Sequence, residues 1–410
     1  MTLFYIIIAI IAADFIFEQT LNCLNTKWRG KPIPPELEGI YDDEKYHKQQ
    51  SYAQTSSRFS IIESSVMTAA TLLFIILGGF GFIDGIVSGI THNMLAQGLL
   101  FMAVMYAAME IIGVPFSIYE TFVIEQKFGF NTTTPSTFVN DKLKGYLISA
   151  IVAGGLYALI YWLYTIAGQL FWIYALVSVS AFSLFMSMFY STLIVPLFNK
   201  QTPLPNGELR EAISQFCGKA GFNLDGIFVI DNSRRSTRAN AYFAGIGAKK
   251  RIVLFDTLIK QMDTDEIVAV LAHEVGHYKR HHIIWSFLLG TMQTGLMLFI
   301  FSIFASNPQL SNALGVSEPK LHISLIAFIL LYNPISTLLE MLMNAFSRKN
   351  EYQADEFCAM NSNPQKLISA LKKLASNNLT NLTPHPIYVW VNYSHPTLQQ
   401  RIIQLEKYKS

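Results

Sequence analysis

Seven long apolar stretches constrain the fold of this chain more than any other feature of its sequence. They cover residues 3–24, 60–87, 97–120, 147–167, 170–198, 283–305 and 321–346. A helix needs about 20 predominantly apolar residues to cross the hydrocarbon core of a bilayer. Each stretch is therefore predicted to be a transmembrane helix, and the chain to be a mainly α, polytopic membrane protein.

The composition excludes several other classes of protein. Of 410 residues, 51% are hydrophobic and 14% are charged, with a mean hydropathy of +0.33. A disordered chain has less apolar surface, and a simple soluble globule could not bury this much of it. The net charge of +2 gives no electrostatic basis for binding nucleic acid, so no nucleic-acid partner is expected. The three cysteines are far apart in the sequence and predict no disulfide framework.

The basic residues indicate how the helices are oriented. In an alternating seven-helix model, 29 of the 30 Lys and Arg residues fall on one side of the membrane, and only Lys320 falls on the other. The side that is rich in basic residues is normally cytoplasmic. We therefore expect the soluble segments to face the cytoplasm, in either a bacterial inner membrane or the endoplasmic reticulum membrane.

Several predicted helices carry polar side chains that lipid would not tolerate. They are Asp14, Glu18, Glu63, Asp84, Glu110, Glu120, Asn333 and Glu340. Such residues usually face the interior of a bundle or water. Two interpretations remain open: they lie at the membrane interface or in helix–helix pairs, or the bundle encloses a wet cavity.

Two segments have the composition of soluble protein, residues 199–282 and 347–410. Residues 227–230, 240–243 and 251–255 are predicted to be short strands of a small antiparallel sheet, with a turn at Gly245 and Gly247. A helix with Thr264 as its N-cap is predicted to follow, through residues 267–282. The chain is thus divided into a membrane domain (1–198) and a second domain (199–410) that includes the last two transmembrane helices.

The predicted helix carries the sequence His273-Glu274-Val275-Gly276-His277. Residues four apart lie on one face of a helix, so both imidazoles can bind one zinc ion. Glu274 is adjacent to the open coordination position, where it can take a proton from water. This motif is the strongest indication of chemistry in the sequence.

A catalytic zinc usually has three protein ligands. The third candidate is Glu351, which is expected to open a helix after the seventh span. Asp355, on the same helix face, can accept a hydrogen bond from a ligand imidazole. His281 and His282 follow the motif beside Lys279 and Arg280 and are expected to form a basic interfacial anchor, the alternative being a position near the zinc.

The sequence resembles the type I CAAX prenyl proteases, membrane-embedded gluzincin zinc peptidases, over nearly its whole length. Outside the zinc motifs, the resemblance is carried by residues 35–37, 115–119, 122–131, 196–200, 240–243 and 394–397 and by Arg401. The matches before residue 200 favour this group over soluble relatives and heat-shock membrane proteases.

The resemblance implies seven helices around a water-filled chamber, with one zinc ion per chain near the cytoplasmic end. His273, His277 and Glu351 are then the metal ligands and Glu274 the general base. Asp355 supports a ligand, and His395, held with help from Arg401, lies near the transition-state oxygen. Asn240 and Tyr242 are placed on a strand that pairs with the substrate backbone.

The expected activity is zinc-assisted hydrolysis of peptide bonds. By the resemblance, the partner is a prenylated protein or peptide that ends in Cys-a-a-X, and the enzyme removes its last three residues. Two alternatives remain: a general quality-control metalloprotease that acts on other membrane-associated polypeptides, and a non-enzymatic chamber or transport protein with a structural metal.

Overall fold

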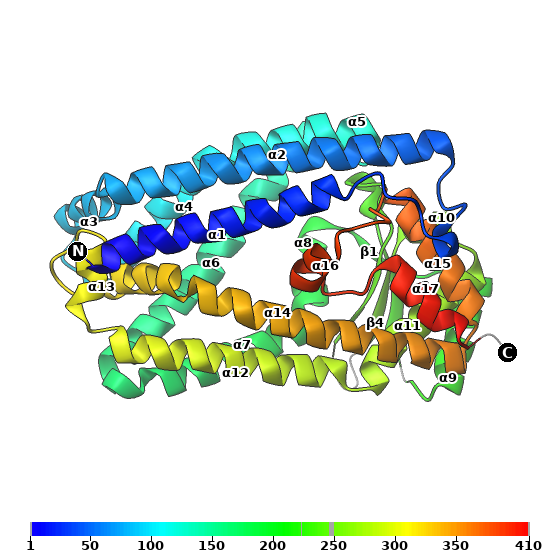
Figure 1. Cartoon of the computed structure of the whole chain (residues 1–410). Coiled ribbons are helices and arrows are strands. Elements are labelled where there is room, and N and C mark those ends of the chain that lie inside the picture. The colour runs from blue at the N-terminus through cyan, green and yellow to red at the C-terminus, as the bar shows by residue number, and fades with distance from the viewer. Residues whose placement is uncertain (1, 223, 246–249, 409–410) are drawn as a thin grey trace.

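The computed structural model describes residues 2–222, 224–245 and 250–408. Figure 1 shows an elongated bundle of long helices with a small sheet-containing domain at one end. The N-terminus lies at the opposite end of the molecule from this domain and from the C-terminus. The prediction of a mainly α membrane fold with a small α+β domain is confirmed.

The long apolar helices lie where the sequence predicts them. Within the described residues, six continuous helical stretches are long and apolar enough to cross a membrane. One of them, Pro135–Phe198, contains two helices joined by a 3₁₀ turn at Gly168–Leu170, where Gly168 has a φ of 54°. These two helices pack against each other, so this stretch accounts for two predicted passes. The helices are α1 (Thr2–Lys27), α2 (Asp43–Ile76), α4 (Met94–Tyr119), α6 (Pro135–Ala167), α7 (Phe171–Leu193), α12 (His282–Phe304) and α14 (Leu321–Asn361).

The predicted second span, 60–87, is not one helix. Helix α2 ends at Ile76, and α3 (Gly79–Ile90) begins after Gly78, which has a φ of 72°. Glycine adopts this left-handed backbone without steric cost, so it permits the chain to change direction there. Periodicity alone does not detect the break, because the residues on both sides of it are apolar.

Few residues of the membrane helices are buried. In the apolar window of each candidate span, only 6–17% of the residues are buried. Carboxylates from different helices approach one another inside the spans: Glu18 of α1 is near Glu340 of α14, and Glu120 is near Glu63 of α2. Exposed carboxylates at this depth require water or polar neighbours. The arrangement favours the wet-cavity interpretation of these residues.

Two hydrophobic cores lie at opposite ends of the molecule. The first includes Phe80, Phe101, Phe171, Phe301 and Phe328, which come from α3, α4, α7, α12 and α14. The second joins the sheet to the helices around it and to the N-terminal segment at Leu37. The first core packs the bundle closely at the end where α3 and α13 lie (Figure 1), and the second forms the interior of the sheet-containing domain.

The sheet has four strands in the order β1-β2-β4-β3. They are β1 (Gln201–Pro203), β2 (Gly226–Ile230), β3 (Ala241–Ala244) and β4 (Arg251–Phe255). The prediction of a purely antiparallel sheet is wrong, because β2 and β4 are parallel. Strand β1 was not predicted, and Gly247 of the predicted turn lies outside the described residues. Strand β3 is an edge strand, paired only with β4 among the described strands.

Shorter helices complete the structure. They are α5 (Gln126–Phe128), α8 (Val195–Phe198), α9 (Glu208–Lys219), α10 (Asp256–Gln261), α11 (Thr264–Lys279), α13 (Pro308–Ala313), α15 (Pro364–Asn377), α16 (Pro386–Asn392) and α17 (Leu398–Glu406). A π-helical turn covers Glu120–Glu125, and 3₁₀ turns cover Pro35–Leu37 and Asn232–Arg234. Helices α11, α14 and α17 together carry the candidate site.

Candidate active site

Helix α11 is fixed at its N-terminus by a capping box. The Asp263 side chain accepts a hydrogen bond from the Glu266 backbone N–H, and the Glu266 carboxylate accepts one from the Asp263 N–H. This reciprocal pair satisfies donors that a helix leaves free at its start. The prediction that Thr264 is the N-cap is wrong by one residue. The helix also ends at Lys279 rather than at His282.

The approach of α11 to α14 depends on a glycine inside the zinc motif. A Cβ atom built on Gly276 would lie 3.0 Å from the Ala354 Cα and 3.0 Å from the Phe357 Cβ. Only glycine fits such a close approach of two backbones without displacing a neighbour. The sequence predicted a separate helix that opens at Glu351, but α14 runs unbroken from Leu321 to Asn361. The last transmembrane helix therefore carries Glu351 directly to the histidines.

His273, His277 and Glu351 converge on one point. Their ligand atoms all lie within 4.8 Å of one another, and the two His Nε2 atoms are 3.2 Å apart. Glu351 Oε2 is 3.4 Å from His273 Nε2, and Glu351 Oε1 is 3.3 Å from His277 Nε2. Bonds of about 2.0–2.1 Å in a tetrahedral zinc site separate neighbouring ligand atoms by about 3.3 Å. The three side chains therefore have the spacing of zinc ligands.

The hydrogen bonding at this point also fits a cation. Glu351 is 4% exposed, and its buried Oε2 atom has no hydrogen-bond partner, although Arg401 Nη1 lies 3.6 Å from it. A buried carboxylate oxygen without a donor is costly unless a cation satisfies it. Two imidazole nitrogens and one carboxylate form the donor set that zinc prefers, with room for a fourth ligand. These three side chains therefore fit a catalytic zinc ion.

Asp355 and Arg401 support one of the histidines from behind. His273 Nδ1 donates to Asp355 Oδ1 at 2.8 Å, which leaves Nε2 free for a metal. Arg401 of α17 donates to both oxygens of Asp355, at 2.9 Å from Nε and 2.6 Å from Nη2. Burial lowers the pKa of His273, but hydrogen bonds to Asp355 and Glu351 outweigh burial and raise it to about 9. The two carboxylates therefore favour a positive charge at this imidazole, either a proton or a metal.

Glu274 and His395 lie on the open side of the group. Glu274 is half-buried, one residue after His273 on α11, and within electrostatic range of Arg401. His395 is 62% exposed at its side chain, and its Nε2 is 3.3 Å from Glu351 Oε1. Its Nδ1 is hydrogen-bonded to the Ser394 hydroxyl at 2.9 Å. An exposed imidazole beside a buried ligand can reach a substrate atom at that ligand.

Asn240 and Tyr242 are at the edge strand of the sheet. Asn240 directly precedes β3, and its side-chain oxygen accepts a hydrogen bond from the Ala241 N–H. Tyr242 lies within β3, which packs against α11. Among the described residues, neither side chain hydrogen-bonds to the histidine–carboxylate group. Their role in binding substrate stays a prediction.

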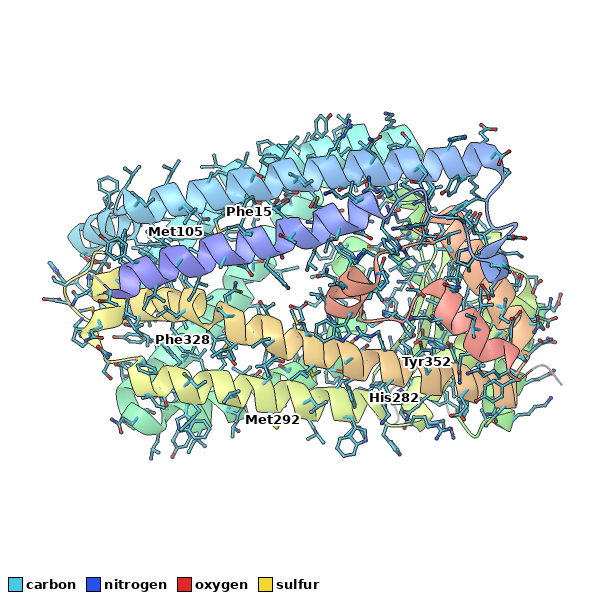
Figure 2. All side chains as sticks on the ribbon, in the orientation of Figure 1. Phe15, Met105, His282, Met292, Phe328 and Tyr352 are labelled. Carbon is cyan, nitrogen blue, oxygen red and sulfur yellow. The ribbon has the colours of Figure 1, made fainter. Side chains whose placement is uncertain are left out.

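The interpretation of His282 as an interfacial anchor is wrong, and the alternative, a position near the zinc motif, agrees with the structure. His282 is 4% exposed and hydrogen-bonds to His277 and to Gln353. Figure 2 shows it beside α14 near Tyr352, at the end of the bundle that carries the sheet. Sequence reasoning missed Gln353, and it ranked the position of His282 near the zinc motif below that of an anchor. The spacing of five residues from His277 was visible, but only the turn after α11 brings the two rings together.

Family models match almost the whole chain. Residues 22–200 match the N-terminal region of CAAX prenyl proteases, with five membrane helices, and residues 203–409 match peptidase family M48. The chain is 32% identical to CAAX prenyl protease 1 of Saccharomyces cerevisiae, over 96% of this chain and 93% of that protein. It is 36% identical to the CAAX prenyl protease 1 homolog of Arabidopsis thaliana, over 95% and 94% of the two chains.

A solved structure shares the same architecture. The crystal structure of S. mikatae Ste24p matches with a TM-score of 0.94 at 32% sequence identity, covering 98% of this chain and 99% of that chain. The similarity therefore includes both the bundle and the sheet-containing domain. With this fold, these matches and the donor set of His273, His277 and Glu351, the chain belongs to peptidase family M48, among the CAAX prenyl proteases.

Proposed function

We propose that this chain is an integral-membrane zinc endopeptidase that removes the last three residues of prenylated proteins ending in Cys-a-a-X. The observation that carries the proposal is the convergence of His273, His277 and Glu351, with Glu274 next in sequence, at one end of a bundle of membrane-length helices. The names of the relatives, CAAX prenyl protease 1, support the choice of substrate. The proposal includes one zinc ion per chain.

Glu274 acts as the general base of the proposed reaction. A zinc ion held by His273, His277 and Glu351 would supply Lewis acidity and make water acidic enough to react near neutral pH. Glu274 accepts the proton of the attacking water and afterwards delivers it to the leaving amine. Its position one residue after a ligand places the carboxylate beside the open side of the donor set.

The remaining polar groups orient the reaction. His395 donates a hydrogen bond to the oxygen that becomes negative in the transition state, and Ser394 fixes its ring. Asp355 and Arg401 hold His273 with its Nε2 lone pair toward the cation. Edge strand β3, with Asn240 and Tyr242, is paired only with β4 among the described strands, so its other edge can pair with an extended peptide.

The membrane domain explains why a lipid-modified substrate suits this site. An isoprenyl chain keeps the substrate at the bilayer, where the bundle is embedded. We propose residues 1–198 as the membrane domain and 199–410 as the peptidase domain, with the site on the cytoplasmic side, because 29 of 30 basic residues fall there. Labelling of single cysteines in loops on each side of sealed vesicles tests this orientation.

The activity is tested with two matched peptides that end in the same Cys-a-a-X sequence, one farnesylated and one not. The purified chain in detergent is expected to release the last three residues of the farnesylated peptide, with mass spectrometry locating the cut. A zinc chelator is expected to stop the reaction. Equal cleavage of both peptides would indicate a general peptidase, and metal binding without any cleavage would indicate a structural metal.

A further inference from the structure

The turn between α11 and α12 places a second pair of polar side chains behind the proposed metal ligands. Helix α11 ends at Lys279, and His281 adopts a left-handed backbone with a φ of 58°. Such a φ is uncommon for a residue other than glycine. It reverses the chain within two residues, so that His282, the first residue of α12, is buried against α14. His281 itself stays exposed.

His282 bridges a proposed ligand and a side chain of α14. Its Nδ1 lies 3.1 Å from His277 Nδ1, and its Nε2 lies 2.9 Å from Gln353 Oε1. The His277 and His282 rings meet edge to face, with centroids 5.1 Å apart. The two hydrogen bonds therefore connect the back of the His277 ring to a residue located two positions after Glu351.

The amide oxygen of Gln353 fixes the direction of both hydrogen bonds. An amide oxygen only accepts, so the proton of the neutral His282 ring is on Nε2, and its Nδ1 carries a lone pair. That lone pair accepts the proton on His277 Nδ1. The His277 Nε2 atom is then unprotonated, and it is this atom that lies 3.3 Å from Glu351 Oε1 and 3.2 Å from His273 Nε2.

We infer that His282 and Gln353 are positioning residues, which hold His277 in the tautomer that binds the metal. The inference rests on the proposed function, because it concerns the same metal site. The two ligand histidines are then supported differently. His273 is held by a charged carboxylate paired with Arg401, whereas His277 is held by a neutral imidazole and amide. Partners of this kind commonly contribute a factor of about 10–100 in metal affinity.

The experiment compares variants of Gln353 in which the hydrogen-bond acceptor is either removed or kept. Gln353→Met keeps the length of the side chain and removes the acceptor, whereas Gln353→Glu keeps an acceptor and cannot donate. Zinc affinity of the full-length chain in detergent is measured by competition with a chromophoric chelator. We expect Gln353→Met and His282→Phe to bind zinc about 10–100 times more weakly, and Gln353→Glu to bind like the parent.

Two controls separate this role from a structural one. His281→Asn changes the exposed neighbour and keeps a residue that tolerates the left-handed backbone, so we expect it to bind zinc like the parent. Thermal unfolding with chelator should give the same midpoint for Gln353→Met and the parent. With zinc, the midpoint of Gln353→Met should rise less, because stabilisation by a ligand follows its affinity.

The outcomes distinguish the two proposals. If Gln353→Met and His282→Phe both bind zinc as tightly as the parent, the inference is wrong, while the proposed peptidase remains. The inference is also wrong if Gln353→Glu loses as much affinity as Gln353→Met, or if the variants lower the unfolding midpoint equally with and without zinc. A parent chain that binds no zinc would instead overturn the proposed function.

Discussion

The two ends of this molecule each contain a buried cluster of a carboxylate, histidine and a basic side chain, but only one cluster leaves a buried carboxylate oxygen without a hydrogen bond. The far cluster lies at the end of the bundle away from the sheet. There Lys320 Nζ donates to Asp84 at 2.7 Å and to Ser88 at 2.7 Å, and His322 Nε2 is 3.0 Å from Asp84. None of these three buried residues has an unpaired buried side-chain atom. The near cluster, around Glu351, lies at the end that carries the sheet, and there Glu351 Oε2 has no hydrogen-bond partner.

The difference lies in the source of the positive charge. At the far end, Lys320 supplies a cation to Asp84, and the cluster joins α3 to the start of α14. At the end that carries the sheet, Arg401 hydrogen-bonds to both oxygens of Asp355 and lies 3.6 Å from Glu351 Oε2, while the two imidazoles converge on Glu351. A cluster in which the side chains pair with one another can stabilise the fold. A cluster whose ligand atoms converge on one point can bind a metal.

The largest effect is expected for Glu274→Gln, which changes the chemistry of the near cluster without removing a proposed ligand. Loss of a general base typically lowers turnover by a factor of about 10²–10⁴. We expect this loss in cleavage of the farnesylated peptide, with zinc affinity unchanged in the chelator competition. Glu356→Gln, which alters a partly exposed carboxylate paired with Arg280, is the matched control and should keep turnover. Normal turnover of Glu274→Gln would remove the base from the mechanism.

The next effect is on the far cluster. Asp84→Asn leaves Lys320 buried without its counter-charge, and breaking a buried pair in this way costs about 3–5 kcal/mol. We expect a lower midpoint of unfolding in detergent and an unchanged zinc affinity of the folded protein. Adding Lys320→Met to Asp84→Asn should restore part of the stability, because the unpaired charge is then removed. Weaker zinc binding in Asp84→Asn would mean that the two clusters are not independent.

A smaller effect is expected for Asp355→Asn in the near cluster. The amide can still accept from His273 Nδ1, but it no longer offers a charged partner to Arg401. Loss of such support weakens metal binding by a factor of about 10–100. Zinc competition on the full chain provides the measurement, and an affinity equal to that of the parent would show that Asp355 serves the fold alone.

The smallest effect concerns the helix that presents the histidines. Burial raises the pKa of Glu266, but hydrogen bonds from Lys373 and Ser369 outweigh it and hold the pKa below its usual value of 4.5. The ionised Glu266 therefore stabilises the fold above that value, and this contribution is lost as the pH falls through the lower folded pKa. We expect Glu266→Gln to cost roughly 1 kcal/mol at pH 7, since Gln can still complete the capping box.

The test of Glu266 is a series of unfolding measurements at different pH values. The difference between Glu266→Gln and the parent should shrink progressively below about pH 4.5. Asp265→Asn, at a side chain that is 74% exposed, should show little difference at any pH. A difference for Glu266→Gln that stays constant down to pH 3 would assign the effect to packing rather than charge.

The local sequence pattern alone was enough to predict the elements whose structure depends only on residues close in sequence. A run of about 20 apolar residues needs no partner to be recognised as a membrane helix, and the prediction of the fold class is confirmed. The sequence likewise predicted α11, because the spacing of His273 and His277 is a property of one helix. It also identified Glu351 and Asp355, four residues apart on a helix face.

Tertiary structure decided what depends on contacts between distant segments. The parallel pairing of β2 with β4 and the unbroken course of α14 follow from packing that periodicity does not record. Gly276 is simply a small residue in the sequence, but in the fold it lets α14 approach closely enough for Glu351 to reach both histidines. The position of His282 behind His277 likewise depends on one left-handed residue and on a partner from α14, because a hydrogen bond between segments requires the fold to exist first.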